Sequence, residues 1–274
     1  MTTGRFAPSP TGPLHLGSLV AAVGSWLFAR HDGGRWLVRM EDLDTPRVIP
    51  GSAGEILTAL ERYALTWDGE VVYQSQRLPL YEAALNELRA RDRVFDCACS
   101  RADLQRAASA PIGDEPIYPG TCRNGIRDGR PPRAVRFRGD GETDDFVVKR
   151  ADGVFAYQLA VVVDDAAQEV TQVVRGADLL SSMPRQIALQ RALGHPTPEY
   201  VHLPLVLGPD GKKLGKRDGA LPLPSLDDRH VAETLHHALA FLGFRVARAS
   251  SPRSMLVEAL DRFPSSAIAA DPRS

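Results

Sequence analysis

The chain has 274 residues, of which 43% are hydrophobic, and its formal net charge is −1 at pH 7. This composition excludes a disordered chain and is typical of a globular protein with one or two domains. The sequence has neither an apolar run of about 18 residues nor an amino-terminal secretory pattern, so we expect a cytoplasmic protein without a membrane partner. A net charge near zero does not indicate a nucleic-acid binder, although the 33 Lys and Arg residues leave room for a local basic face.

The first segment with a chemical signature extends from Arg5 to Leu19. It has the pattern of a short strand, a turn rich in Pro and Gly, and a helix start, and its apolar residues from Leu19 to Leu27 have helical spacing. The amino terminus of such a helix presents free backbone N–H groups and a positive dipole end, which suit a phosphate. His15 directly precedes the helix and adds a donor. An ordinary strand–loop–helix connection is the alternative interpretation.

A strand is expected at residues 35–40, followed by the acidic segment 41–44. Ligands bind at the carboxyl ends of strands in α/β sheets, so Glu41 is a candidate ligand for an amine, and Asp44 ranks below it. A solvated acidic loop is the alternative.

Two helices are expected next. The segment Ser52–Glu55 has the pattern of a capping box that opens the first helix. The core face of this helix would contain Ile56, Leu57, Leu60 and Tyr63. The second helix spans roughly Leu80 to Arg91, and strands that alternate with helices in this way predict a parallel, Rossmann-like sheet.

The composition changes after residue 94, where a segment rich in Gly, Pro and Arg begins. Short strands return at residues 134–138 and 146–150, and we interpret the whole segment as a small subdomain inserted between two halves of the sheet. It contains every cysteine of the chain: Cys97, Cys99 and Cys122.

These three cysteines are too few for a disulfide framework, and thiols at this density in a cytoplasmic protein favour zinc. The segment has no His, so a fourth ligand has to be a carboxylate or a phenolate, and Tyr118 is placed to supply a phenolate. Three unrelated buried thiols are the alternative.

The second half of the sequence begins with a turn at residues 152–153, and a strand is expected over residues 154–159 before an apolar run. A further strand at Val170–Val174 leads to Arg175. A guanidinium binds a carboxylate through two parallel hydrogen bonds, so Arg175 is a candidate carboxylate clamp. A surface ion pair is the alternative.

A helix from Pro184 to Leu193 and a strand at His202–Leu207 precede the cationic segment 212–217. This segment suits a polyphosphate, although most charge runs are solvated surface. The last core helix starts near Ser225, and one more helix is expected near Met255–Phe263.

Two of these segments together resemble the signatures of class I glutamyl-tRNA synthetases. Residues 8–18 resemble the HIGH signature and residues 213–217 resemble the KMSKS loop. Residues 156–160 and 174–178 also look like segments of this family, so the likeness covers nearly the whole chain. Gly215 departs from the pattern, which has Ser there, and this removes a hydroxyl that could contact phosphate.

The resemblance implies an α/β fold with the Rossmann-like catalytic core of class I aminoacyl-tRNA synthetases. We expect this core to be split between residues 1–95 and 151–244. Residues 96–150 would form the inserted zinc and RNA-contacting subdomain, and residues 245–274 a short helical tail without an anticodon-binding domain.

In its short length the chain resembles the glutamyl-Q tRNA(Asp) synthetases, a branch of the family that keeps the catalytic core and lacks the anticodon-binding part. The Cys-x-Cys…Tyr-x-x-x-Cys zinc pattern of that branch matches Cys97, Cys99, Tyr118 and Cys122 residue by residue. One structural Zn²⁺ per chain is therefore implied.

The implied reaction is the ATP-dependent activation of L-glutamate to glutamyl-adenylate, with Mg²⁺ accompanying ATP. Glutamate would then pass to the cyclopentene diol of queuosine, at the wobble position of tRNA(Asp). The partner would be the anticodon stem-loop of that tRNA, and we expect the protein to act as a monomer.

The resemblance also implies the site residues. Glutamate would be bound by Arg5, Phe6, Ala7, Pro8, Ser9, Glu41, Tyr157 and Arg175. ATP would be bound by His15, Gly17, Ser18, Lys213 and Lys216, with His15 and Lys216 in catalytic roles.

There are two alternative interpretations of the function. A minimal glutamyl-tRNA synthetase that charges the 3′ end of tRNA(Glu) is disfavoured by the short length of the chain. A non-catalytic RNA-binding paralogue is disfavoured because His15, Glu41, Arg175 and Lys216 are all retained.

Overall fold

A computed structural model describes most of the chain, as a mixed α/β structure. The described residues are 1–100, 102–104, 118–127, 129–208, 223, 227–248 and 251–263. The fold divides into two compact units: Met1–Ser75 with Glu169–Leu180 and Pro198–Ser274, and Gln76–Gln168 with Ser181–Thr197. The division into catalytic core, inserted subdomain and tail is a functional one and stays a prediction.

The first unit contains a three-stranded and a two-stranded parallel sheet, which lie side by side. Strands β1 (Thr3–Phe6), β2 (Arg35–Met40) and β3 (Val72–Tyr73) pair in parallel in that order, and β7 (Gln172–Gly176) pairs in parallel with β8 (Glu199–Leu203). Strand β7 packs beside β1, and where both strands begin the Thr171 N–H donates to the Thr3 carbonyl at 3.0 Å. Strands that start together and lie side by side run in the same direction, so the carboxyl ends of β1, β2 and β7 share one edge. The expected parallel sheet is confirmed.

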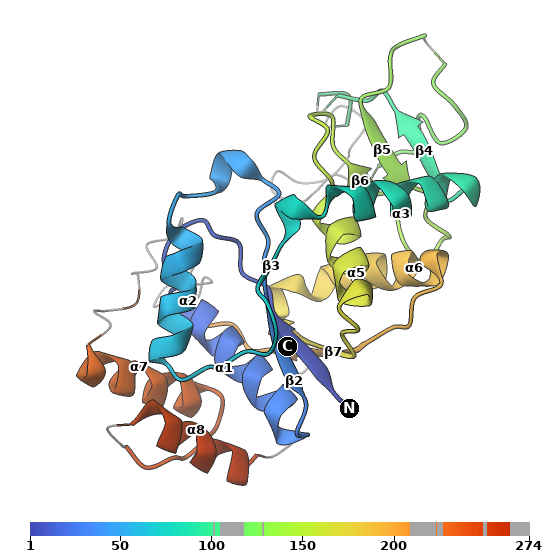
Figure 1. Cartoon of the computed structure of the whole chain (residues 1–274). Coiled ribbons are helices and arrows are strands. Elements are labelled where there is room, and N and C mark those ends of the chain that lie inside the picture. Colours follow the sequence, from blue (N-terminus) through green and yellow to red (C-terminus); the bar gives the residue numbers. More distant parts are fainter. Residues whose placement is uncertain are drawn as a thin grey trace. The chain divides into compact units, whose positions relative to one another are not determined.

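Four helices of the first unit are described. They are α1 (Leu16–His31), α2 (Ser52–Arg62), α7 (Asp228–Phe241) and α8 (Pro252–Asp261). Helix α1 packs against β1, β2 and β7 on one side and against α7 and α8 on the other, as Figure 1 shows for its helical neighbours. Short 3₁₀ turns are found at Thr45–Arg47, Gln74–Gln76 and Ala177–Ser182.

The strands of the first unit have one apolar face and one face on which buried arginines lie beside apolar residues such as Leu37 and Val173. The core on the α1 side is built by Phe6, Trp36, Val38, Met40, Val174, Val201 and Leu203. Side chains alternate along a strand, so Arg5, Arg39 and Arg175 lie on the opposite face. All three are buried. Burial of a charged side chain is costly unless a partner compensates it, which directs attention to this face.

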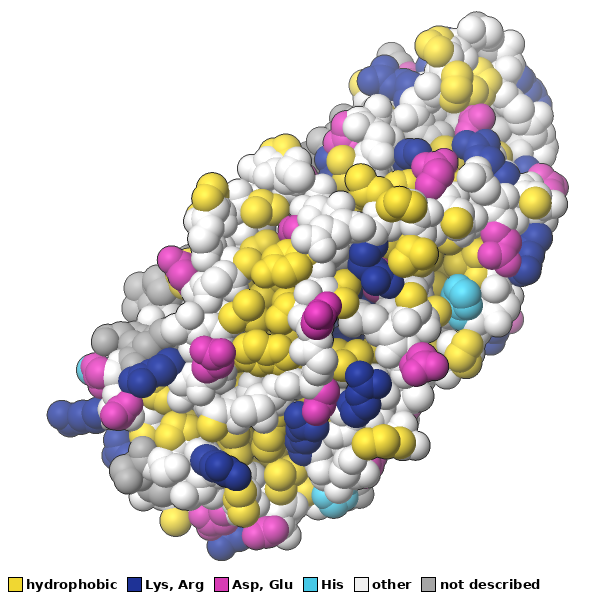
Figure 2. All heavy atoms as spheres, viewed as in Figure 1, with side chains coloured by type: hydrophobic (Ala, Val, Ile, Leu, Met, Phe, Trp, Pro, Cys, Tyr) yellow, Lys and Arg dark blue, Asp and Glu magenta, His cyan; other side chains and the backbone are white. Residues whose placement is uncertain are grey.

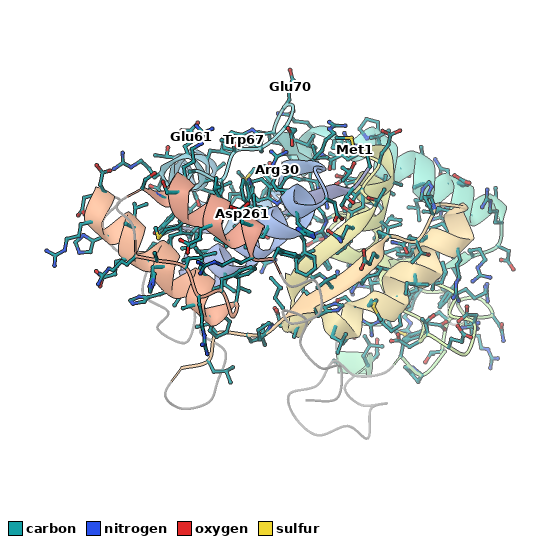
Figure 3. The ribbon with its side chains drawn as sticks, turned by 90° about the horizontal axis from the view of Figure 1, so that it is seen from below. Met1, Arg30, Glu61, Trp67, Glu70 and Asp261 are labelled. Carbon is teal, nitrogen blue, oxygen red and sulfur yellow. The ribbon has the colours of Figure 1, made fainter. Side chains whose placement is uncertain are left out.

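Arg30, labelled in Figure 3, fastens the end of α1 to the segment after α2. Its guanidinium donates to the carbonyls of Gly34 at 3.0 Å and Thr66 at 2.9 Å, and it pairs with Asp68 at 2.8 Å. The Asp68 carboxylate also accepts the backbone N–H of Trp36 at 2.8 Å, in β2. This network fixes the amino-terminal end of β2, opposite the edge that carries Glu41.

The second unit combines an antiparallel sheet with helices. Strands β4 (Val94–Cys97), β5 (Ala134–Phe137) and β6 (Val147–Lys149) pair antiparallel in that order. The long helices described in this unit are α3 (Leu78–Ala90), α5 (Tyr157–Ala167) and α6 (Met183–Leu193). The expected strands at 134–138 and 146–150 are confirmed, as is the helix opened by Pro184.

The strand expected over residues 154–159 is wrong. Phe155 makes only an isolated bridge to Lys149, and Tyr157 already begins α5. A short apolar run is compatible with a buried strand or a buried helix. Here it forms a helix, whose buried residues extend as far as Asp164 and Asp165. The Asp164 carboxylate accepts the Tyr81 hydroxyl at 2.8 Å and an Arg77 guanidinium N–H at 2.6 Å, so it belongs inside the helix.

Other boundaries differ in detail. The strand expected at His202–Leu207 is β8, which begins earlier and ends at Leu203. The helices expected near 225 and 255 are confirmed as α7 and α8. Across the described ranges, no helix is long and apolar enough to cross a membrane. The face seen in Figure 2 carries acidic and basic side chains interspersed, in keeping with the net charge of −1.

Candidate active site

The loop between β1 and α1 is fastened to the segment that follows β2. The Glu41 N–H donates to the Pro8 carbonyl at 2.9 Å, and the Ile49 N–H donates to the Pro10 carbonyl at 3.0 Å. The Ser52 hydroxyl accepts the Gly12 N–H at 3.0 Å and donates to the Gly12 carbonyl at 2.9 Å. Gly12 has a φ of 123°, which side chains rarely tolerate. These contacts hold the loop in one shape ahead of α1.

The capping box expected at Ser52 is therefore wrong. The N-cap of α2 is Gly51, with a φ of 84°, and Ser52 is already helical. Because the Ser52 hydroxyl is used by Gly12, it holds the loop in place of capping its own helix.

His15 is the N-cap of α1. Its Nδ1 accepts the Ser18 backbone N–H at 3.3 Å, and its Nε2 lies 3.1 Å from the Ser18 hydroxyl. The ring lies over Gly17, where a Cβ would come within 3.2 Å of His15 Cε1. The structure thus brings His15, Gly17 and Ser18 together at a helix amino terminus, and their role toward ATP stays a prediction.

Glu41 follows directly after β2 and has an arginine beside it that sequence reasoning missed. Arg39 is completely buried at 0% exposure, and its Nη2 lies 3.7 Å from Glu41 Oε1. Residues two positions apart in an extended segment point to the same face, so the side chains of Arg39 and Glu41 lie together. The signal in the sequence was an arginine among the apolar residues 36–40, at the position two residues before the candidate carboxylate.

Arg5 and Arg175 lie near the carboxyl ends of the adjacent strands β1 and β7, and both are buried. We refer to Arg5, Arg39 and Arg175 as the sheet-edge arginines. They bring three positive charges to the edge at which α/β sheets bind ligands. For Arg175, the alternative of a surface ion pair is wrong, because the side chain is buried.

Arg175 is held by two residues of β8. It is in register with His202, and its Nε donates to His202 Nε2 at 3.3 Å. The centre of its guanidinium lies 5.1 Å from the centre of the Tyr200 ring, which itself stacks with the His202 ring at 7°. His202 and Tyr200 were not predicted, because the sequence of a strand does not indicate which other strand it will pair with.

The pKa of His202 is lowered, first by burial and further by the Arg175 charge, while Asp178 opposes the shift. The imidazole is therefore neutral at pH 7, which lets Nε2 act as an acceptor. The Asp178 carboxylate lies close to Gly176, where a Cβ would come within 2.5 Å of Oδ1, so a larger residue at position 176 would displace this side chain.

The remaining predicted residues are distributed unevenly. Phe6 belongs to the apolar core and stacks on Trp36, with ring centres 6.2 Å apart. Ala7 and Pro8 are partly buried and Ser9 is exposed. Tyr157 is the first residue of α5, in the second unit. Lys213 and Lys216 lie outside the described residues.

The second unit brings together the four residues predicted to bind zinc, which we refer to as the thiol cluster. The sulfur atoms of Cys97, Cys99 and Cys122 all lie within 4.8 Å of one another. The Tyr118 hydroxyl lies 3.6 Å from Cys97 Sγ and accepts the Cys122 N–H at 2.7 Å. Three thiols and a phenol at this spacing fit the tetrahedral donor set of a structural metal, so they are not unrelated buried thiols.

A guanidinium accompanies the thiol cluster. Arg136, in β5, lies over the Tyr118 ring with its centre 4.0 Å from the ring centre. Burial raises the pKa of the Cys97 thiol, but hydrogen bonds from the Cys99 backbone, Tyr118 and Arg136 outweigh it and lower that pKa. Burial, aided by the neighbouring thiols, raises the pKa of Cys99 to about 11. Cys97 is thus favoured as the first thiolate.

Comparison with known proteins gives a consistent result. The family model of class I tRNA synthetases (E and Q), catalytic domain, matches residues 1–125 and 134–253. A glutamyl-Q tRNA(Asp) synthetase of Geobacter sulfurreducens is 57% identical over 263 residues, covering 88% of this chain and 84% of the relative. One from Thiobacillus denitrificans is 56% identical and covers 88% of this chain and 85% of the relative.

Among solved structures, a glutamate tRNA ligase from Elizabethkingia meningosepticum in complex with its amino acid superposes with a TM-score of 0.79. It is 28% identical, and the match covers 98% of this chain. This chain spans 66% of the length of that ligase.

Proposed function

The chain belongs to the catalytic-domain family of the class I tRNA synthetases for glutamate and glutamine, and we propose that it activates L-glutamate and transfers it to queuosine in tRNA(Asp). The observation that carries this proposal is the charge pattern at the sheet edge. Glutamate has two carboxylates and one ammonium. Arg5 and Arg175 supply cations for the carboxylates, and Glu41, which lies beside Arg39, supplies an anion for the ammonium, at the edge where such sheets bind ligands. The names of the close relatives support the choice of acceptor.

In the first step, an oxygen of the glutamate α-carboxylate attacks the α-phosphorus of ATP. The bond to the β-phosphate breaks, and glutamyl-adenylate and pyrophosphate form. Both reactants are anions, so catalysis depends on positioning and on charge stabilisation. Mg²⁺ enters with ATP and is part of the substrate.

We assign the residues to this step as follows. Arg5 and Arg175 bind the carboxylates of glutamate, Glu41 binds its ammonium, and Tyr157 donates a hydrogen bond to the substrate. The loop residues Ala7, Pro8 and Ser9 line the same pocket, Ala7 and Ser9 through their backbone, whereas Phe6 ends β1 and packs in the core. His15, the N–H groups near Gly17 and Ser18, and Lys213 hold the triphosphate, and Lys216 stabilises the departing pyrophosphate.

In the second step, a hydroxyl of the cyclopentene diol of queuosine attacks the carbonyl carbon of glutamyl-adenylate. An ester forms, AMP leaves with the bonding electrons, and the hydroxyl proton is released. The RNA partner is the anticodon stem-loop of tRNA(Asp), and ATP and tRNA place the reaction in the cytoplasm. We propose that a monomer suffices, since the residues assigned above come from one chain.

We further propose that Cys97, Cys99, Tyr118 and Cys122 hold one structural Zn²⁺. The donor set fits a closed tetrahedral site, and such a site stabilises the fold around it. The zinc-containing segment contributes to binding RNA and not to the reacting atoms.

The test is transfer of labelled glutamate to tRNA from cells that contain queuosine and from cells that cannot make it. We expect label only in the first pool, and expect ribonuclease digestion to find it in the anticodon fragment of tRNA(Asp). Equal labelling of both pools, with the label at the 3′ end, would contradict the proposal and indicate a minimal glutamyl-tRNA synthetase.

A further inference from the structure

We infer that His202 is a positioning residue for the reaction: it occupies the Nε side of Arg175 and turns the other end of the guanidinium toward the substrate carboxylate. The inference rests on the proposed function, because it names what sets the orientation of one of the proposed glutamate ligands. The orientation of Arg175 follows from the pairing of β7 with β8.

The first observation is the register of these strands. Arg175 and His202 are directly paired across β7 and β8, and the Arg175 Nε donates to His202 Nε2 at 3.3 Å. Both side chains are buried. A neutral imidazole that accepts at Nε2 carries its proton on Nδ1, so one tautomer of His202 is required. The donor of this bond is charged and its acceptor is buried, and at 3.3 Å the bond is longer than most N–H hydrogen bonds.

The second observation is the aromatic face beneath the guanidinium. Tyr200 lies 5.1 Å from the Arg175 guanidinium centre, and its ring is nearly parallel to the His202 ring, at 7°. An arginine that lies over an aromatic ring and is bonded at Nε has lost much of its rotational freedom. Both restraints come from one strand, and both precede substrate binding.

The consequence concerns how the carboxylate is bound. A guanidinium can pair with a carboxylate side-on through Nε and Nη2, or end-on through Nη1 and Nη2. His202 takes the Nε position, so the end-on mode is selected. A pre-oriented fork loses less entropy when glutamate binds, and the gain is in affinity for glutamate and not for ATP.

The experiment separates the acceptor from the ring. His202→Phe keeps an aromatic ring beside Tyr200 and removes the acceptor, while His202→Gln keeps an acceptor and removes the ring. Glutamate-dependent ATP–pyrophosphate exchange is measured for both variants and for the wild-type enzyme, with KM for glutamate and for ATP determined separately. His237, exposed on α7, provides the matched controls His237→Phe and His237→Gln.

We expect His202→Phe to raise KM for glutamate about tenfold or more, the effect of losing a charge-assisted hydrogen bond. KM for ATP should change little, and His202→Gln should restore most of the affinity. Both His237 variants should resemble the wild type, and thermal unfolding of each variant shows whether it is folded.

Two results would overturn the inference. Unchanged KM for glutamate in a folded His202→Phe enzyme means that the pair does not orient Arg175. Equal losses for glutamate and ATP in both variants, without rescue by Gln, mean a purely structural role. Failure of the proposed function is distinguished from these, because the wild-type enzyme would then show no glutamate-dependent exchange.

Discussion

The thiol cluster and the sheet-edge arginines bury ionisable groups in opposite ways. In the thiol cluster, three sulfur atoms within 4.8 Å of one another concentrate groups that become negative when they bind a metal. At the sheet edge, Arg5, Arg39 and Arg175 concentrate groups that are already positive. Each arrangement is costly to bury unless charge of the other sign meets it.

The local compensation differs accordingly. Arg136 lies over Tyr118 and lowers the pKa of Cys97, so a cation assists the thiols. At the sheet edge, Glu41 lies 3.7 Å from Arg39, while Arg175 is bonded to the neutral His202. His202 orients the guanidinium without itself cancelling the charge, and the Asp178 carboxylate is an anion near His202. The comparison indicates that the thiol cluster suits a permanently bound cation and that Arg175 suits an anion that comes and goes.

The largest expected effect concerns the thiol cluster and its permanently bound cation. Cys122→Ser should reduce bound zinc from one per chain to nearly none, measured by elemental analysis of the purified protein. A structural zinc is worth on the order of 10 kcal/mol in small metal-dependent folds, so thermal stability should fall with it. Adenylate formation should fall less than metal content and less than tRNA binding.

Thr121→Ser, at the exposed neighbouring position, is the control for this variant. Normal zinc content in both Cys122→Ser and Cys97→Ser would refute the metal site. Removal of zinc from the wild-type protein by a chelator should reproduce the loss of stability, and added zinc should reverse it.

The next effect concerns Arg175 and the anion that binds to it reversibly. Arg175→Lys keeps a positive charge but loses the planar fork and the Nε donor to His202. We expect glutamate-dependent ATP–pyrophosphate exchange to fall about a hundredfold, which corresponds to roughly 2.7 kcal/mol. The control Arg253→Lys, at an exposed position of α8, should leave the exchange unchanged. An Arg175→Lys enzyme with a normal KM for glutamate would show that the charge alone is sufficient.

The two regions also differ in how far the sequence predicts them. The chain has only three cysteines, and thiols at this spacing favour a metal site over disulfides. All four residues of the thiol cluster could therefore be predicted from the sequence. The ends of the expected strands likewise pointed to Glu41 and Arg175, and the family resemblance added Arg5. By contrast, His202 lies in an apolar run, and its pairing with Arg175 depends on which strands become neighbours.

Errors of local interpretation have a similar cause. The Ser52–Glu55 pattern satisfies the capping-box rule, yet the Ser52 hydroxyl bonds to Gly12, 40 residues away in the sequence. The apolar run after Tyr157 fits either a strand or a buried helix, and the contacts of Asp164 with Arg77 and Tyr81 favour the helix. In both cases a contact distant in sequence decides between two locally acceptable structures.

A smaller effect is expected from that distant contact. Ser52→Ala removes both hydrogen bonds to Gly12 and leaves the N-cap at Gly51 intact. The free energy of unfolding should fall by about 1–3 kcal/mol, because two buried hydrogen bonds are lost. KM for ATP should rise, since the loop ahead of α1 loses its anchor. Ser254→Ala, exposed on α8, is the control, and an equal effect there would contradict the anchoring role.

The smallest effect concerns the proton on His202. Burial lowers the pKa of this imidazole, Arg175 lowers it further, and Asp178 opposes the shift. Its folded-state pKa therefore lies below the unfolded value of about 6.5, so its contribution to stability is fully present above pH 6.5 and is lost as the pH falls through the folded pKa. The slope from one such group is at most about 1.4 kcal/mol per pH unit.

His202→Phe should flatten this part of the pH dependence, measured by urea unfolding between about pH 7 and pH 5. The wild-type protein loses stability in this window partly because protonated His202 would face the Arg175 guanidinium, and the Phe variant cannot be protonated. The control His237→Phe removes an exposed imidazole and should keep the wild-type slope. Identical slopes for wild type and His202→Phe would mean that the imidazole is free to protonate beside Arg175, and the neutral partner that distinguishes the sheet edge from the thiol cluster would be lost.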